Sequence, residues 1–211
     1  MKTLIITIVL CASIIYSYPL AAQPDTMNSE ISKNLQSWLQ KIPPGQEKLY
    51  GFNNRDEFSL SELGNPYAVY TLSSDFFNHI ESGNFLELAG EWRVPVVVNN
   101  QDRALLTVIR ENGNWKIVDL GASLLARELQ KINQAQKSGN DDLKILRVFQ
   151  LQSDFLLLDD TALPASEIHI VPLHSAYLNL EKLNSDNREI YKLSDMLTII
   201  REAISEIKAN F

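Results

Sequence analysis

The sequence predicts an α+β protein in which an antiparallel meander sheet is covered by helices. Three apolar, β-branched runs lie between Glu91 and Gly121 and are separated by turn-forming residues, the pattern of consecutive antiparallel strands. Segments with the apolar spacing of amphipathic helices precede and follow this stretch. At 211 residues and 45% hydrophobic content, the chain can bury a core of its own.

Both connections of the predicted meander carry turn chemistry. Asn99 to Asp102 is a run of residues that tolerate turn conformations, and Asn112-Gly113 favours a tight two-residue hairpin. We therefore expect strands at 92–98, 103–110 and 115–120.

The first of these strands contains a proline. Its continuous apolar run predicts partial cover on both faces. Because proline has no N–H to donate, Pro95 indicates a strand at a sheet edge or at a bulge. In the third strand, Trp115, Ile117 and Val118 are expected to face the core.

Three helices are predicted around the meander. The first spans 29–42, stops at Pro43-Pro44 and is capped by Asn28 or Ser29. The second spans 122–137 and is capped by Ser123, and the third begins at a Ser194 cap. The expected apolar faces are Ile31, Leu35, Trp38, Leu39 and Ile42 in the first helix; Leu124, Leu125, Leu129 and Ile132 in the second, with Arg127, Glu128 and Lys131 opposite; and Met196, Leu197, Ile200, Ala203, Ile204 and Ile207 in the third.

The other segments have shorter signals. Strands are predicted at 67–72, 144–150 and 153–158, a short extended segment at 167–172, loop at 46–58, and weak helix or loop at 177–183. Phe76, Phe77 and Ile80 lie on a candidate short helix that ends near Gly83.

The first 22 residues have the layout of a secretory signal peptide: Lys2, then an apolar run, then small residues at Ala21 and Ala22. Cleavage after Ala22 would leave a single domain at 23–211, secreted or periplasmic, and any sub-division would fall near 138–143. An uncleaved anchor helix is the alternative, although the apolar run is shorter than the ~20 residues of a membrane span. The only cysteine, Cys11, lies in this leader, so the mature chain would have no disulfide or thiolate.

Charge argues against several partners. Losing Lys2 from the 19 basic residues would leave 18 against 26 acidic ones, a net charge of −8. An acidic surface repels phosphate backbones and anionic headgroups, so we expect neither nucleic-acid binding nor stable membrane insertion after cleavage.

The segments GNPYAVYTL, WRVPVVVNN and RALLTVIRENGNWKIVDLGAS, followed by a helix, resemble the core of uncharacterised exported bacterial proteins with a cystatin-like or PepSY-like helix-on-sheet form. The resemblance covers about Gly64 to Gln130. It implies a binding or inhibitory role more than catalysis. The Gln-x-Val-x-Gly loop of cystatin-type inhibitors has no counterpart here.

The sequence carries few signals for catalysis. The histidines, His79, His169 and His174, have no metal-binding spacing, and Ser123 lies outside any Gly-x-Ser-x-Gly motif. No phosphate loop occurs, so we expect no catalytic residue, metal or cofactor. Two carboxylate pairs, Asp141-Asp142 and Asp159-Asp160, leave hydrolase chemistry and calcium open as alternatives.

The sequence favours a non-catalytic binding module for a peptide, protein or glycan, of unknown oligomeric state. The alternatives are an inhibitor or pro-domain-like partner of a secreted protease, and a carboxylate-based hydrolase. The candidate ligand-binding residues are Trp92, Pro95 and Trp115, through aromatic faces and through the edge of the proline-containing strand. Packing in the core is the competing interpretation for the tryptophans, Trp38 included.

Overall fold

A computed structural model of the chain describes residues 24–77, 85–136, 144–183 and 189–209. The predicted signal peptide with Cys11, His79, Ile80, Gly83 and the Asp141-Asp142 pair lie outside these ranges. In chain order the elements are α1 (Pro24–Leu39), the 3-10 helices η1 (Glu47–Tyr50) and η2 (Arg55–Leu60), β1 (Glu62–Leu63), β2 (Tyr67–Leu72), η3 (Ser74–Phe77), β3 (Leu86–Val98), β4 (Gln101–Glu111), β5 (Asn114–Gly121), α2 (Ser123–Gln136), β6 (Lys144–Val148), η4 (Phe149–Leu151), β7 (Ser153–Leu157), β8 (His169–Pro172), α3 (His174–Asn179), β9 (Tyr191–Lys192) and α4 (Leu193–Ala209).

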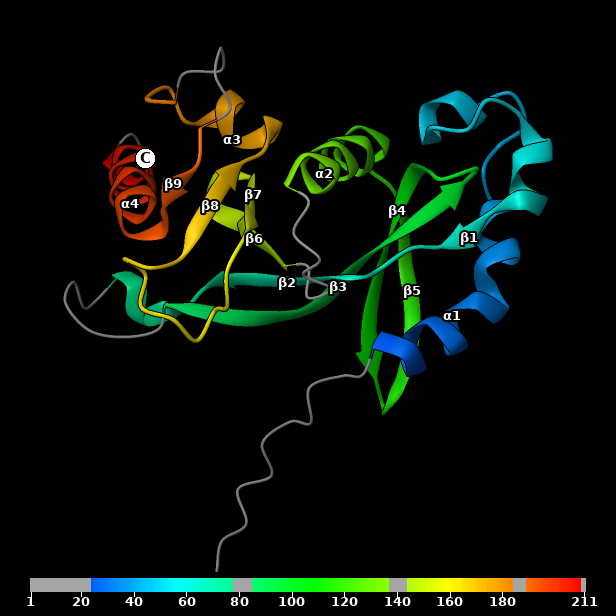
Figure 1. Cartoon of the computed structure of the whole chain (residues 1–211), viewed down its shortest axis with the longest axis horizontal. Helices are drawn as coiled ribbons and strands as arrows, with labels where there is room; N and C mark the ends of the chain where they lie inside the picture. The colour runs from blue at the N-terminus through cyan, green and yellow to red at the C-terminus, as the bar shows by residue number, and fades with distance from the viewer. Residues whose placement is uncertain (1–23, 78–84, 137–143, 184–188, 210–211) are drawn as a thin grey trace, which may run out of the picture.

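The protein is α+β, built on one large mixed sheet of nine strands in which most pairs are antiparallel. The path runs β5-β4-β3-β2-β6-β7-β8-β9, and β1 pairs with β3 beside β2. The single parallel pair along it, β2 with β6, joins the predicted meander β3-β4-β5 to a second antiparallel run, β6 to β9. Figure 1 shows the two halves side by side, with β2 and β3 running between them.

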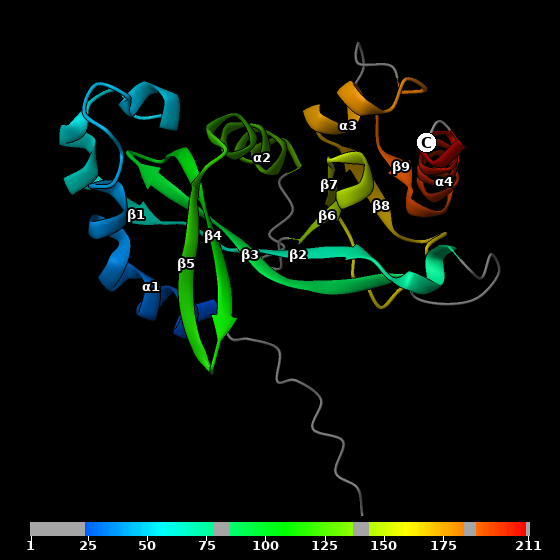
Figure 2. The same cartoon turned by 180° about the vertical axis from the view of Figure 1, so that it is seen from behind.

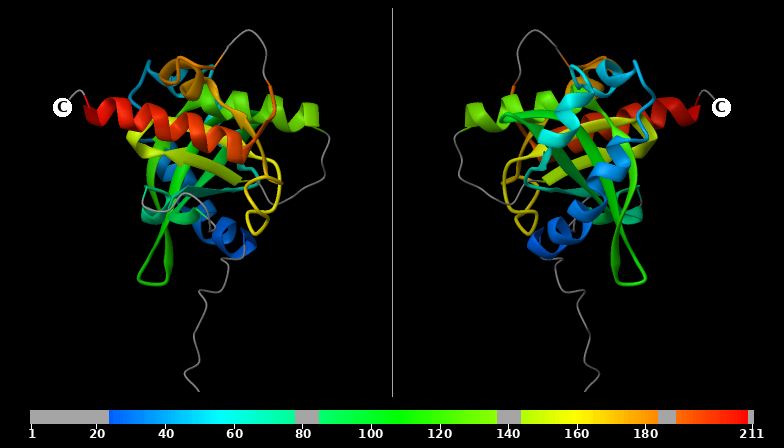
Figure 3. Two further views of the ribbon diagram at one scale, coloured as in Figure 1. Left: turned by 90° about the vertical axis from the view of Figure 1, so that its left-hand side faces the viewer. Right: turned by 90° about the vertical axis from the view of Figure 1, so that its right-hand side faces the viewer.

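Helices cover each half. Helix α1 lies along β5, and the view from behind in Figure 2 shows it against the outside of the meander. Helix α2 packs over β4, while α3 and α4 cover the second half. Figure 3 shows that the tip of the β4–β5 hairpin extends beyond the rest of the sheet. Within the described ranges, no helix has the length and apolarity needed to cross a bilayer.

Three apolar clusters lie between these layers. The first packs α1 and η2 against one face of β3, β4 and β5, the second packs α2 against β6, β7 and β8, and the third packs α3 and α4 against the second half. The predicted helices and strands that supply them are confirmed. The main additions are the helical turns η1 and η2 in the predicted loop at 46–58.

The two hairpins of the meander are confirmed in backbone geometry. Asn99 and Asn100 have φ of 51° and 61°, and Asn112 and Gly113 have φ of 52° and 84°, the left-handed conformation that two-residue hairpin turns require. Asparagine and glycine adopt it at low cost, so the turns fix the register of the flanking strands.

Of the two alternatives predicted for Pro95, an edge strand or a bulge, the edge strand is wrong, whereas the β3–β4 register does shift close by, between Val96 and Val97. Strand β3 is internal, with β4 on one side and β1 and β2 on the other. The carbonyl of Pro95 accepts a 2.8 Å hydrogen bond from the Gly64 N–H, so the missing donor of Pro95 also faces this side. There β1 has ended at Leu63 and β2 begins only at Tyr67, so no ladder partner requires an N–H from Pro95.

Several predicted helix caps are wrong by position. Asn28 and Ser29 lie inside α1, which begins at Pro24, a residue tolerated in a first helical turn. Ser123 and Ser194 are likewise the first and second residues of α2 and α4 and lie inside them.

Four predicted side-chain environments are also wrong, and one of them is Ile207, which was expected on the apolar face of α4 and is 42% exposed. Leu124 is 71% exposed, whereas Glu128 is buried, because α2 presents Ala126, Leu129 and Ile132 to the sheet. Val118 is exposed because strand alternation points it away from the face on which Trp115 and Ile117 are buried. The β4–β5 register also shifts there, since Val108 pairs with Ile117 and Thr107 pairs with Asp119.

Candidate functional site

Two hollows flank the short strand β1. One, of about 350 Å³, lies between α1 and β1, and the other, of about 590 Å³, lies between the end of η2, β1 and the β3–β4 turn. They share Ser61 and Glu62, and we call them together the β1 groove. Their linings consist of Asn28, Ser32, Leu35, Gln36, Ser61, Glu62 and Leu63 in the first, and Ser59, Leu60, Ser61, Glu62, Val97, Asn99 and Asn100 in the second.

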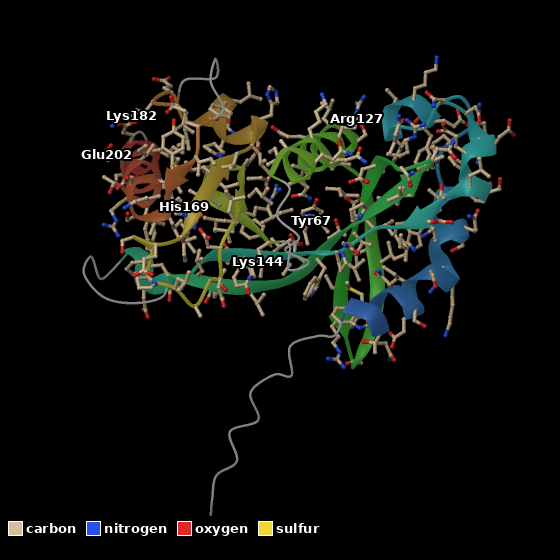
Figure 4. All side chains as sticks on the ribbon, viewed as in Figure 1. Tyr67, Arg127, Lys144, His169, Lys182 and Glu202 are labelled. Atoms are coloured by element: carbon tan, nitrogen blue, oxygen red, sulfur yellow. The ribbon has the colours of Figure 1, made fainter. Side chains whose placement is uncertain are left out.

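A third hollow, of about 170 Å³, lies beneath α2, and we call it the Asp102 pocket. Gly64 lies between it and the groove, because a Cβ added at Gly64 would lie 3.0 Å from the Pro95 Cβ, which lines the pocket, and 3.1 Å from the Val97 Cγ2, which lines the groove. Figure 4 shows Tyr67 at this place, where β2 begins under α2. The pocket is lined by Gly64, Asn65, Tyr67, Pro95, Asp102, Gln130, Asn133 and Gln134.

A β-bulge aims Asp102 into this pocket. Val96 pairs with Ala104 but Val97 pairs with Asp102, so Arg103 is an extra residue in β4. In regular alternation, Asp102 would share a face with Ala104 and Leu106, which are buried in the α1 cluster. The bulge instead places its carboxylate on the α2 side.

Contacts from η1 and η2 hold the bulge. A Cβ added at Gly51, whose φ is +91°, would lie 2.1 Å from the Arg103 carbonyl oxygen and 2.8 Å from the Ser123 Cβ. The guanidinium of Arg103 donates a 2.7 Å bond to Glu57, which also accepts from the Asn53 backbone and side chain. The loop before β1 therefore fixes the shape of the strand that carries Asp102.

The local environment raises the pKa values of two side chains, Asp102 and Tyr67. Burial raises the pKa of Asp102 to about 6. Burial and the negative charge of Asp102 also raise the pKa of Tyr67 well above its usual range, against a smaller opposing effect of the hydrogen bond that the Asn133 amide donates to the Tyr67 hydroxyl. Both groups change proton affinity because they share a poorly solvated space.

Other shielded carboxylates in the described parts of the chain have close partners. Asp154 receives bonds of 3.0 and 3.2 Å from Arg147, although burial still raises its pKa. Glu128 accepts two bonds from the His174 backbone N–H. The carboxylate of Asp102 has no cation or donor of this kind among the described residues, although the Asp102 backbone N–H bonds to Gln130.

The structure separates the three predicted ligand-binding residues. Trp92 and Trp115 pack edge-to-face at 6.3 Å on the α1 side of the sheet, where the Trp115 backbone N–H donates to the Glu30 carboxylate of α1 at 2.9 Å. Pro95 lies on the opposite face and lines the Asp102 pocket. Strand alternation explains the separation, because positions 92 and 95 differ by an odd number. Trp38 is partly buried against the α1 cluster.

The other sequence candidates have structural partners. Asp159 accepts from the backbone N–H and Nδ1 of His169, at 2.6 and 2.9 Å, and Asp160 accepts from the Ala162 N–H in a turn. Within the described segments, no three histidine, cysteine or acidic side chains gather as a metal site would need.

Sequence reasoning missed Glu62, Tyr67 and Asp102 as site residues. Asp102 looked like the last residue of a polar turn, and nothing in the sequence marks the Arg103 bulge that turns it inward. The available signal was weaker: a carboxylate next to an apolar strand, between Asn-rich turn residues and a helix rich in glutamine.

A fourth hollow, of about 280 Å³, lies between α4 and the α3 region, in the other half of the protein. Apolar side chains such as Leu151, Ile199 and Ile207 line it. At its edge Lys182 is paired with Glu202, as Figure 4 shows at the outer end of the second half. None of the described residues that line it has a pKa raised by burial, as that of Asp102 is.

No family model matches this chain, and neither the curated proteins nor the solved structures contain a significant match.

Proposed function

We propose that the protein is an exported, non-catalytic binding module whose ligand is an extended peptide segment lying in the β1 groove. The observation that carries this proposal is the position of β1. Among the described strands, β1 pairs only with β3, and the 350 Å³ hollow lies between β1 and α1. An extended peptide can add to such a strand edge by main-chain hydrogen bonds.

The lining of the β1 groove suits a peptide. Amide and hydroxyl side chains such as Ser32, Gln36 and Asn100 can bond peptide groups, and Leu60, 56% exposed, offers apolar contact. The Oδ1 atom of Asn28 is buried without a hydrogen-bond partner at the groove wall, so a ligand N–H would satisfy it. The described lining holds no aromatic ring on which a sugar would stack, which favours a peptide over a glycan.

The charge of the lining limits the peptide. Among the described residues that line the groove, Glu62 is the only charged one, and none is a lysine or arginine. A neutral or basic segment therefore fits better than an acidic one. The cystatin-like or PepSY-like form, with its implied binding role, is part of this proposal.

The test is selection from a phage-displayed library of random peptides, followed by calorimetry with the selected synthetic peptides. Leu60→Lys is expected to weaken binding roughly tenfold by removing apolar contact. The matched control is Leu178→Lys, on α3 and 69% exposed, which should bind as the wild type does. Equal affinity for Leu60→Lys and wild type would contradict the proposed groove.

A second candidate function, the carboxylate-based hydrolase, has one observation in its favour. Glu62 and Asp102 both pair with Val97, from opposite sides, so the three residues form one cross-strand row. Two strand spacings put their Cα atoms about 10 Å apart, and the pKa of Asp102 is raised.

In that hydrolase, protonated Asp102 would donate to the leaving oxygen of a glycoside while Glu62 takes a proton from the attacking water. Aryl glycosides of common sugars are the direct assay. Activity lost in both Glu62→Gln and Asp102→Asn would replace the binding proposal, whereas no turnover leaves the binding module as the function.

A further inference from the structure

The Asp102 pocket poses a specific problem of charge. At neutral pH its carboxylate is ionised, since its pKa is about 6, yet the side chain is half-buried and no described cation lies beside it. Glu57 and Asp154, the comparable carboxylates, each have an arginine within 3.0 Å. A shielded, unpaired carboxylate costs folding free energy, which a cationic ligand would recover.

The other polar groups in the pocket offer hydrogen-bond acceptors to a ligand group that donates several N–H bonds. Because the Asn133 Nδ2 donates to the Tyr67 hydroxyl, the Asn133 side-chain carbonyl is left as an acceptor. Tyr67 oxygen and the Asp102 carboxylate are further acceptors in the same lining. Three acceptors match the three donors of an ammonium group.

The volume of the pocket and the negative charge around it both suit an ammonium group. A hollow of about 170 Å³ admits a small organic group, since a cavity of roughly 150 Å³ holds a benzene-sized molecule. Glu62 adds a second negative charge in the same cross-strand row, and none of the described residues that line the pocket is basic. Anions are therefore disfavoured and cations attracted.

We propose that the Asp102 pocket binds an ammonium group, held by Asp102, Asn133 and Tyr67. The role as an anchor for one end of a peptide in the β1 groove rests on the function proposed above, whereas ammonium binding itself does not. Two sources share this chemistry in a peptide: the N-terminal amine and a lysine side chain.

The first experiment uses methylammonium chloride alone. A titration of the Asp102 carboxyl carbon by NMR should give a pKa near 6 in sodium chloride, and methylammonium at equal ionic strength should lower it.

Asp102→Asn should abolish binding of methylammonium, measured by its effect on the Tyr67 ring signals. Asp119→Asn, which removes an exposed carboxylate from β5, is the matched control and should leave binding unchanged. An Asp102 pKa that methylammonium does not change would overturn the inference.

The second experiment identifies the source with three versions of one selected peptide. One has a free N-terminus and no lysine, one is acetylated and contains one lysine, and one is acetylated and has no lysine. We expect one of the first two to bind wild type at least roughly tenfold more tightly than the third, and to lose this advantage with Asp102→Asn.

The outcomes separate the two proposals. Equal binding of all three peptides to wild type and Asp102→Asn would overturn the ammonium anchor and leave the groove in place. Binding of none of them, with methylammonium still lowering the Asp102 pKa, would overturn the groove and leave the ammonium site.

Discussion

The two faces of the β3–β4 hairpin have opposite character. On the α1 side, Val94, Val96, Val98, Ala104, Leu106 and Val108 are all completely buried. On the other side, the strand ends next to the β3–β4 turn carry Val97 and Asp102 and border two hollows. Near the β3–β4 turn, the same two strands thus form a dry core on one face and a partly open polar surface on the other, whereas farther along β4 Leu105 is buried against α2.

The difference shows how two strands can support folding stability on one face and leave the other face free to bind a ligand. Apolar burial on the α1 face supplies the folding free energy, since its side chains leave water completely. The opposite face then has room for a shielded carboxylate that costs stability. One residue, the bulged Arg103, decides which face Asp102 joins.

The largest effect should come from charging the closed face. Ile117, 4% exposed in the α1 cluster, becomes a buried unpaired carboxylate in Ile117→Asp. We expect a loss of at least about 4 kcal/mol, enough to unfold most of the protein. Thermal melts followed by circular dichroism measure it. Val118→Asp, at the adjacent and exposed position, is the control and should melt within a few degrees of wild type; an unchanged melt for Ile117→Asp would remove the core assignment.

A smaller loss should follow from pushing on the bulge. In Gly51→Ala the new methyl group would overlap the Arg103 carbonyl, and φ is +91°, so we expect a cost of roughly 2 to 4 kcal/mol. Gly45→Ala, with φ +83° and open space around it, carries only the backbone cost of about 1 kcal/mol. Urea unfolding compares the two variants, and equal losses would show that the contact with Arg103 has no effect.

The smallest effect has the opposite sign. Because the folded pKa of Asp102 lies above its ordinary value of 3.8, the native state holds this proton more tightly, and its contribution to stability is lost as pH rises towards about 6. Asp102→Asn removes the ionised group and should stabilise the protein by about 1 kcal/mol at pH 7, after allowance for solvent screening at the open pocket.

The measurement is urea unfolding of wild type and Asp102→Asn at pH 4 and at pH 7. The difference between them should be present at pH 7 and nearly vanish at pH 4. A variant less stable than wild type at pH 7 would mean that the carboxylate has a stabilising partner.

Local signals in the sequence predicted most of the fold. The Asn112-Gly113 hairpin and the apolar spacing of α4 depend on neighbouring residues, so the chain itself carries the information. The environment of Pro95 depends instead on where β1 ends and β2 begins, which is a tertiary fact. A proline considered only within its own strand favours a sheet edge, but β3 is internal, because the strand facing the Pro95 nitrogen is interrupted at that point.

The candidate site was much less predictable than the fold. Glu62, Asp102 and Tyr67 come from three strands, and their proximity depends on strand pairing and on one bulge. The tryptophans were candidates because large aromatic side chains often bind ligands. Large aromatic side chains also favour burial, and Trp115 is in the core, 9% exposed. The large aromatic residues therefore belong to the core or pack against it, and polar residues without a sequence motif line the hollows.

The parallel pairing of β2 with β6 has a kinetic consequence. Ala68 pairs with Lys144, so this ladder closes a loop that contains the whole meander and α2. Contacts within the meander join residues close in sequence and close their loops quickly, whereas the β2–β6 ladder carries a large loop-closure entropy. We therefore expect β3-β4-β5 to form early and the union of the two halves to limit the folding rate, so substitutions at the β2–β6 seam should slow folding more than equally destabilising ones in α4.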